Sequence, residues 1–174
     1  GLLDLALLST VPPHPDIDSE FVHEEPLFLV TRNVAGVAPR AVPLSELATF
    51  ALVIPRRPNA FRVLVEDALA KLGLPPRIAM EADGVDAILG LVADGVGSAV
   101  LGAAAVATAV VPGRYTINPI GAPGLSTRIH LATSSQRPTT QAQRALMTLI
   151  RATLPEALDP SHRHGTPRHP DTCP

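Results

Sequence analysis

The middle third of the chain alternates short apolar runs with segments of helical periodicity, and this alternation constrains the fold more than any other feature. Ala51–Ile54, Arg77–Glu81 and Gly97–Leu101 have the length and apolar character of strands. Between them, Phe61–Leu72 and Asp83–Gly95 carry apolar residues at spacings of three and four, which predicts helices. The order strand, helix, strand, helix, strand predicts a parallel sheet with right-handed crossovers, and therefore an α/β fold.

Local signals mark the ends of these helices. Asn59 and Asp83 each precede a helical segment, where their side chains can act as N-caps. Gly73 can end the first helix in a left-handed cap, and two prolines follow it. Near the end of the chain, Thr140 and Gln143 form the pattern of a capping box, which predicts the start of a closing helix.

The segments on either side of this middle unit also contain predicted strands. The apolar run Leu2–Leu8 predicts a strand buried on both faces, as in parallel sheets. Further strands are predicted at Glu25–Thr31, Tyr115–Ile120 and Thr127–Thr133, and a short helix at Leu44–Thr49. The chain thus enters and leaves the middle unit through strands.

This order predicts a domain over residues 1–157 that is divided into two lobes. Residues 1–41 and 112–157 form lobe I, and residues 42–111 form lobe II. From residue 158 to residue 174 the periodicity stops and Pro, His, Ser and Thr dominate, which predicts a disordered tail.

Composition excludes several classes of protein. The 174 residues are 46% hydrophobic with a net charge of −2, so the chain can build a core but has no basic excess for nucleic acid. A single cysteine, Cys173, excludes a disulfide framework and favours a reducing compartment. No signal peptide and no apolar stretch of membrane-span length are present, so we expect a cytoplasmic protein without a membrane partner. The abrupt start at Gly1, inside an apolar run, suggests a fragment.

Signals of catalysis or metal binding are weak. No nucleophile elbow, phosphate-binding loop or metal-binding motif is present, and Gly95-Val96-Gly97 lacks the third glycine of a dinucleotide fingerprint. His162, His164 and His169 lie in the predicted tail, where incidental histidines are favoured over a metal site because metal sites need fixed geometry. We therefore expect a binding module rather than an enzyme, with no cofactor and no metal.

Two loops are candidates for ligand binding, because in each a strand leads directly into a helix. These are Arg56–Ala60 and Ala82–Gly84. Free backbone N–H groups at helix starts can bind anions, and ligands of open α/β sheets gather at the carboxyl ends of strands. The alternative interpretations stay open: Asn59 and Asp83 act only as caps, and the arginines lie in a solvated loop.

The ordered set of segments resembles the effector domain of LysR-type transcriptional regulators. Gly1–Leu7 is similar to that family's "G-x-L-D-L-A-I" strand, and Glu25–Val30 to its "E-x-L-x-L-V" strand. Pro43–Ala48 is similar to its "x-L-x-D-L-A" helix, and Leu52–Arg62 to "L-I-x-P-x-R-x-x-G-x-R". Glu81–Leu101 resembles the family's long segment that ends in "A-G-x-G-x-x-x-L-P". The resemblance covers about residues 1–157.

The resemblance implies a two-lobed fold similar to type 2 periplasmic binding proteins, with an incomplete first lobe and a small-molecule effector in the cleft. Carried onto matching positions, the effector-binding candidates are Ser9, Thr10, Arg57, Pro58, Asn59, Asp83, Leu101 and Gly102. An anionic metabolite is one candidate effector. Gly102 stands where the family usually has proline, and from the resemblance we expect the given chain to lack the winged helix-turn-helix and the first strand and helix of the effector domain.

The implied function is sensing: effector binding changes lobe closure and dimer geometry, and so transcription, when a DNA-binding domain is attached. The full-length protein is expected to form a homodimer or tetramer and to contact DNA only through the missing N-terminal domain. The alternative is a solute-binding protein of a transporter, which has the same fold. A small α/β enzyme is the third hypothesis, for which no nucleophile with a base can be assembled.

Overall fold

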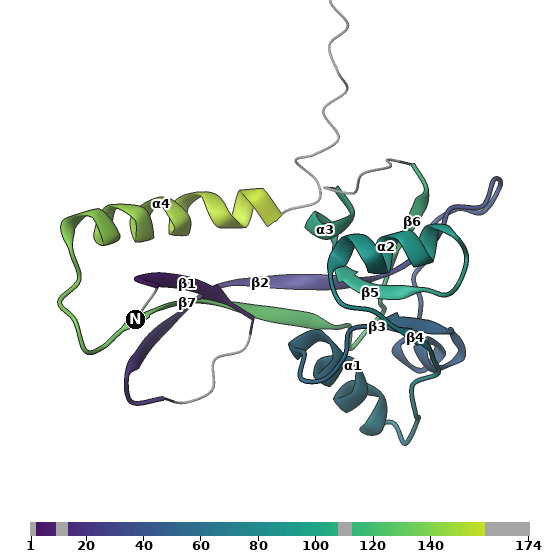
Figure 1. The fold of residues 1–174 in the computed structure, drawn as a ribbon. Helices are drawn as coiled ribbons and strands as arrows, with labels where there is room; N and C mark the ends of the chain where they lie inside the picture. The colour runs from purple at the N-terminus through teal and green to yellow at the C-terminus, as the bar shows by residue number, and fades with distance from the viewer. Residues whose placement is uncertain (1–2, 10–13, 108–112, 159–174) are drawn as a thin grey trace, which may run out of the picture.

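The computed structural model describes residues 3–9, 14–107 and 113–158 (Figure 1). Its strands are β1 (Leu5–Leu8), β2 (Ile17–Arg32), β3 (Leu52–Ile54), β4 (Ile78–Glu81), β5 (Ala99–Gly102), β6 (Tyr115–Pro119) and β7 (Ser126–Ser134). Its helices are the 3₁₀ helix η1 (Leu44–Thr49) and the α-helices α1 (Ala60–Ala70), α2 (Val85–Ala93), α3 (Ala103–Ala107) and α4 (Gln141–Leu158). The predicted α/β class is confirmed, as are helices at Leu44–Thr49 and in the middle third.

The 16-residue strand β2 connects the two ends of the molecule (Figure 1). Its first part, Ile17–Pro26, pairs antiparallel with β7, and β1 pairs antiparallel with the other edge of β7. Its second part pairs antiparallel with β5 and with β6. At about 3.3 Å per residue, β2 reaches from the side of the molecule that holds β1, β7 and α4 to the side that holds α1–α3.

The one parallel pair of strands in the described residues lies in the middle of the chain, and an isolated parallel bridge also joins Val42 to Ile120. β3 and β4 pair in parallel, and Leu52 also forms a parallel bridge with Ser98, just before β5. The predicted parallel arrangement is therefore confirmed for this unit. The sequence did not predict that β5 would also pair antiparallel with β2.

Strands β3 and β5 are buried along their whole length because a helix covers each face. Leu52 and Ile54 point into the cluster packed against α1 and η1, whereas Val53 points into the cluster packed against α2. β5 divides in the same way, with Val100 on the α1 side and Ala99 and Leu101 on the α2 side. Successive side chains of a strand point to opposite faces, so a continuous apolar run fits this double-sided core.

The prediction that the first strand is buried on both faces is wrong. β1 is half exposed and antiparallel, with Leu7 44% exposed, and it forms one end of the strand order β1-β7-β2-β5. An apolar run specifies a strand but not the number of layers that cover it.

Above these strands lies α4, none of whose described residues is buried (Figure 1). It is held by the Arg151–Glu20 ion pair to β2, 2.6 Å between Nε and Oε1.

The predicted capping signals have different outcomes. Asn59 caps α1, Gly73 has a positive φ of 71° after the helix, and Thr140 and Gln143 form the capping box of α4. Asp83 does not cap α2: the N-cap is Gly84, and no side chain caps that end.

Within the described part of the chain, no helix has the length and the apolar character needed to cross a membrane.

Candidate functional site

A pocket of about 340 Å³ lies where the carboxyl end of β3, the starts of α1 and α2, and the β5–α3 junction meet. Parallel pairing brings the ends of β3 and β4 to one edge, so both strand-to-helix turns open toward the same side. The backbone N–H of Ala82 fixes this arrangement by donating to the carbonyl oxygen of Ile54, 3.1 Å away. A cavity of about 150 Å³ is known to hold a benzene molecule, so this pocket has room for a single-ring ligand.

The walls of this pocket are almost entirely apolar. Val65 and Ile88 contribute from α1 and α2, Leu101 from β5, and Leu158 from the end of α4. Among the described lining residues, Glu25 is the only one whose side chain can carry a charge. Asn59 adds an amide. A ligand here would be enclosed by aliphatic groups and oriented by very few polar ones, as is usual for small-molecule sites.

Glu25 reaches the pocket from β2, where it pairs with Thr127 of β7. The residue is 8% exposed, and no described residue donates a hydrogen bond to its carboxylate. Burial raises the pKa of this carboxyl above its ordinary value, because desolvation disfavours the charged form. A Cβ placed on Gly102 would lie 2.5 Å from Cδ of Glu25 and closer still to Oε1. The glycine therefore provides the space that the carboxylate occupies.

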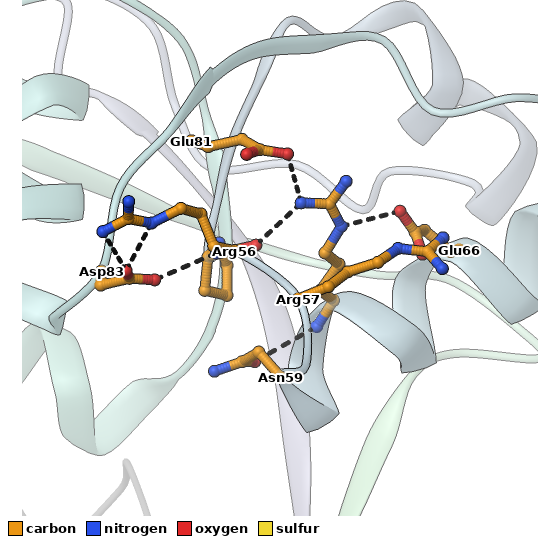
Figure 2. Close-up of polar contacts among 8 residues, drawn as sticks. Arg56, Arg57, Asn59, Glu66, Glu81 and Asp83 are labelled. Carbon is orange, nitrogen blue, oxygen red and sulfur yellow. Dashed lines mark hydrogen bonds and ion pairs between the residues drawn. The ribbon is translucent and has the colours of Figure 1, made fainter.

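Asn59 has a structural role in addition to its place in the pocket. Its Oδ1 accepts hydrogen bonds from the backbone N–H groups of Phe61, at 2.9 Å, and Arg62, at 3.4 Å. These are donors of the first helical turn that would otherwise lack a partner. The cap thus fixes the start of α1 beside the pocket (Figure 2).

The arginines next to the pocket are already paired with carboxylates (Figure 2). Nε of Arg56 donates to Asp83 over 2.7 Å, and the backbone N–H of Arg56 donates to the same carboxylate over 3.1 Å. These two hydrogen bonds lower the pKa of Asp83, the backbone bond having the larger effect. Nη2 of Arg57 lies 2.5 Å from Glu66. These charges are compensated before any ligand binds.

A second, buried ion-pair network lies behind them. The Arg62 side chain is about nine-tenths buried and donates to Glu66 over 2.8 Å, to the carbonyl oxygen of Pro55 over 3.2 Å, and to Glu81. It ties the first turn of α1 to the ends of β3 and β4. Pro55 lines the pocket, whereas the charged side chains of Arg62, Glu66 and Glu81 do not.

The residues predicted as effector contacts separate into three groups. Asn59, Leu101 and Gly102 line the pocket. Arg57, Pro58 and Asp83 lie on the adjoining turns, and Ser9 follows β1, but these four are not among its lining residues. Thr10 lies outside the described residues.

Sequence reasoning missed Glu25 and the apolar faces of α1 and α2. A carboxylate at the start of an otherwise apolar strand was a visible signal, although it served only as part of a strand motif. No group of three His, Cys, Asp or Glu residues in the described ranges could hold a metal ion. The histidines and Cys173 of the predicted tail lie outside those ranges.

The family of this chain is shown by comparison of its sequence with family models. The model of the LysR substrate binding domain matches residues 1–155. The chain belongs to this family. The LysR resemblance predicted from the ordered segments is thereby confirmed, and the domain is a LysR substrate-binding, or effector-binding, domain.

Curated relatives of this LysR domain are longer proteins. The chain is 28% identical over 137 residues to the HTH-type transcriptional regulator BbuR of Bordetella bronchiseptica, covering 78% of the chain and 42% of the relative. It is 29% identical over 102 residues to the HTH-type transcriptional regulator YybE of Bacillus subtilis, covering 58% of the chain and 35% of the relative. The chain thus spans about two fifths or less of the length of these regulators.

Several solved structures share the fold of this chain, among them regulators, a regulatory domain and an effector-binding domain. An OxyR mutant from Corynebacterium glutamicum has a TM-score of 0.77 at 17% identity, covering 90% of this chain and 49% of that one. The Synechocystis CcmR regulatory domain in complex with 2-PG has a TM-score of 0.72 at 19% identity, covering 86% and 73%. The effector-binding domain of QuiR in complex with shikimate has a TM-score of 0.65 at 19% identity, covering 89% and 70%. The predicted type 2 periplasmic-binding-protein-like fold class is confirmed.

Proposed function

We propose that this LysR domain senses a small-molecule effector in the pocket between β3, α1, α2 and β5. The observation that carries the proposal is a pocket of about 340 Å³ with apolar walls and one buried carboxylate, at the carboxyl ends of parallel strands. Ligands of open α/β folds bind at such strand ends. A sensor has to bind its effector tightly and selectively: the apolar walls of this pocket can supply affinity, and its few polar groups can supply selectivity.

The proposed signal passes through β2. Glu25, at the pocket, belongs to the same strand as Glu20, which is paired with Arg151 of α4. A ligand that binds one arrangement of the two ends of β2 more tightly shifts the population toward it. We propose that these ends correspond to lobe I (1–41 and 112–157) and lobe II (42–111), and that their relative closure is the output.

We further propose that lobe closure acts on the assembly of a full-length regulator. In a full-length cytoplasmic regulator, lobe closure would change the geometry of a homodimer or tetramer and so its contact with DNA. The matched regulators carry HTH in their names, and one similar solved structure is full-length CbnR in complex with its target DNA. We propose this assembly in preference to a solute-binding protein of a transporter because the chain belongs to the LysR family.

We propose sensing rather than catalysis because the described pocket lining has one titratable side chain and no nucleophile beside it. An anionic effector, suggested by the sequence, has weaker support. Arg56 and Arg57 are paired with Asp83 and Glu66, so an anion would depend on backbone N–H groups at the helix starts. It would also approach the carboxylate of Glu25.

The test is to fill the pocket mouth. Val85 is 42% exposed and lines the pocket, whereas Val63 is 43% exposed on α1 and does not. Val85→Trp should abolish binding of the neutral single-ring probe benzyl alcohol, and Val63→Trp should leave it unchanged. Ligand-observed NMR measures the binding and circular dichroism checks the fold. Equal binding by folded Val85→Trp would refute the proposed site.

A further inference from the structure

The buried carboxylate of Glu25 needs a hydrogen-bond donor or a cation as its partner, and no described residue supplies one. Its carboxylate is 8% exposed in an apolar wall, without a hydrogen-bond donor from any described residue. Burying an unpaired charge is costly, so such groups are normally paired or become neutral. Glu25 is one of the residues that line the pocket.

The backbone around Glu25 is built to hold the carboxylate in this place. Gly102 ends β5 opposite Leu27, two residues along β2 from Glu25. Any side chain at position 102 would overlap the carboxylate, since even a Cβ would approach within 2.5 Å of its Cδ. The carboxylate therefore occupies a defined niche at the pocket wall.

The positive and negative side chains at the pocket differ in whether they have a partner of opposite charge. The cationic side chains of Arg56, Arg57 and Arg62 are each paired with a carboxylate outside the lining. The anionic group of Glu25 is inside the lining and lacks a partner among the described residues. The pocket thus offers an uncompensated acceptor to a ligand, and no free cation from its described walls.

We propose that this pocket selects effectors with an apolar body and a cationic, N–H-donating head, such as a primary ammonium group, which pairs with Glu25. This inference rests on the proposed effector site. Charge-assisted hydrogen bonds are the stronger kind, and their strength increases in a low-dielectric pocket. The ammonium supplies the donors that the carboxylate lacks, and the aliphatic walls enclose the rest of the molecule.

The experiment compares three probes of one size by isothermal titration calorimetry: benzylammonium, benzyl alcohol and benzoate. The wild-type chain should bind benzylammonium about tenfold or more tightly than benzyl alcohol, the factor expected for a hydrogen bond to a charged group. Benzoate should bind most weakly. Glu25→Gln, which keeps the shape but removes the charge, should reduce the preference for benzylammonium to about twofold or less.

A second pair of variants keeps the test decisive if Glu25→Gln does not fold. Gly102→Ala forces the carboxylate out of its niche and should reduce benzylammonium affinity more than benzyl alcohol affinity. Gly90→Ala is the matched control, because Gly90 lies in α2 with no heavy atom near the added Cβ. Its probe affinities should equal those of the wild type.

The outcomes separate the two proposals. If benzyl alcohol binds and Val85→Trp abolishes that binding, the site stands; a wild type that then shows no preference for benzylammonium overturns the cationic selectivity alone. A preference that persists in folded Glu25→Gln overturns it as well. If none of the probes binds in a manner sensitive to Val85→Trp, the effector site and its selectivity both fall.

Discussion

Gly102 and Glu25 are steric complements: the space that a side chain at position 102 would fill is occupied by the Glu25 carboxylate. The two residues lie on paired strands, β5 and β2, and both line the pocket. This relationship links the fold to the site, because the strand pairing that builds the core also places an uncompensated carboxylate in an apolar wall.

Gly102→Ala should destabilise the folded chain by about 1–3 kcal/mol, the usual cost of overpacking a filled space. Gly90→Ala should instead stabilise it by about 0.5–1 kcal/mol, since Gly90 lies in an exposed helix position with room for a Cβ. Urea denaturation of both variants measures the difference. Equal effects would show that the carboxylate moves aside without cost.

Glu25 should make stability depend on pH in a defined direction. Because burial raises its pKa in the folded state, the folded protein binds the proton more tightly than the unfolded chain. Its contribution to stability is therefore largest below the ordinary glutamate pKa and is lost as pH rises through the higher folded pKa. The free energy of unfolding of the wild type, minus that of Glu25→Gln, should fall as pH rises above about 4.5. A difference that rises with pH would contradict the burial effect.

Asn59→Ala should reduce the free energy of unfolding by about 1 kcal/mol because the first turn of α1 loses its cap. Asn59→Asp retains a capping oxygen and should stay close to the wild type in stability. Thermal unfolding of the two variants at one pH checks this. A stable Asn59→Ala variant would indicate that water replaces the cap.

Arg62→Ala should lower the urea midpoint much more than Arg56→Ala. Arg62 is buried and bonded to Glu66, Glu81 and the carbonyl oxygen of Pro55, so its loss leaves several groups without a partner. Arg56 forms an exposed pair with Asp83, a kind of interaction that contributes little. Similar midpoints for the two variants would mean that the buried network adds no more than the surface pair.

Local signals in the sequence predicted much of the fold. The cap at Asn59, the left-handed Gly73 and the capping box of Thr140 and Gln143 all depend on neighbours within a few residues. Their outcomes could therefore be predicted without tertiary information. Asp83 had the same type of signal, but its carboxylate pairs with Arg56, 27 residues away, and Gly84 became the cap.

The candidate site was predicted less completely. Strand-to-helix turns are readable from the sequence, and Asn59, Leu101 and Gly102 indeed line the pocket. The pairing of Arg56 and Arg57 with carboxylates was not readable, since Asp83 lies 27 residues from Arg56 and Glu66 nine residues from Arg57, and only the fold brings each pair together. For this reason the sequence suggested an anion-binding site at these loops, whereas in the folded chain their arginines are already paired with carboxylates.

By itself, the sequence determined the order of strands and helices, the α/β class and the LysR resemblance, because these depend on periodicity and on the succession of local patterns. Tertiary structure alone decided that β2 pairs with β5, β6 and β7, that β1 lies half exposed at the end of the strand order, and that Glu25 enters an apolar pocket. The physical reason is that strand pairing joins residues far apart in the chain, and burial and charge compensation depend on those distant neighbours.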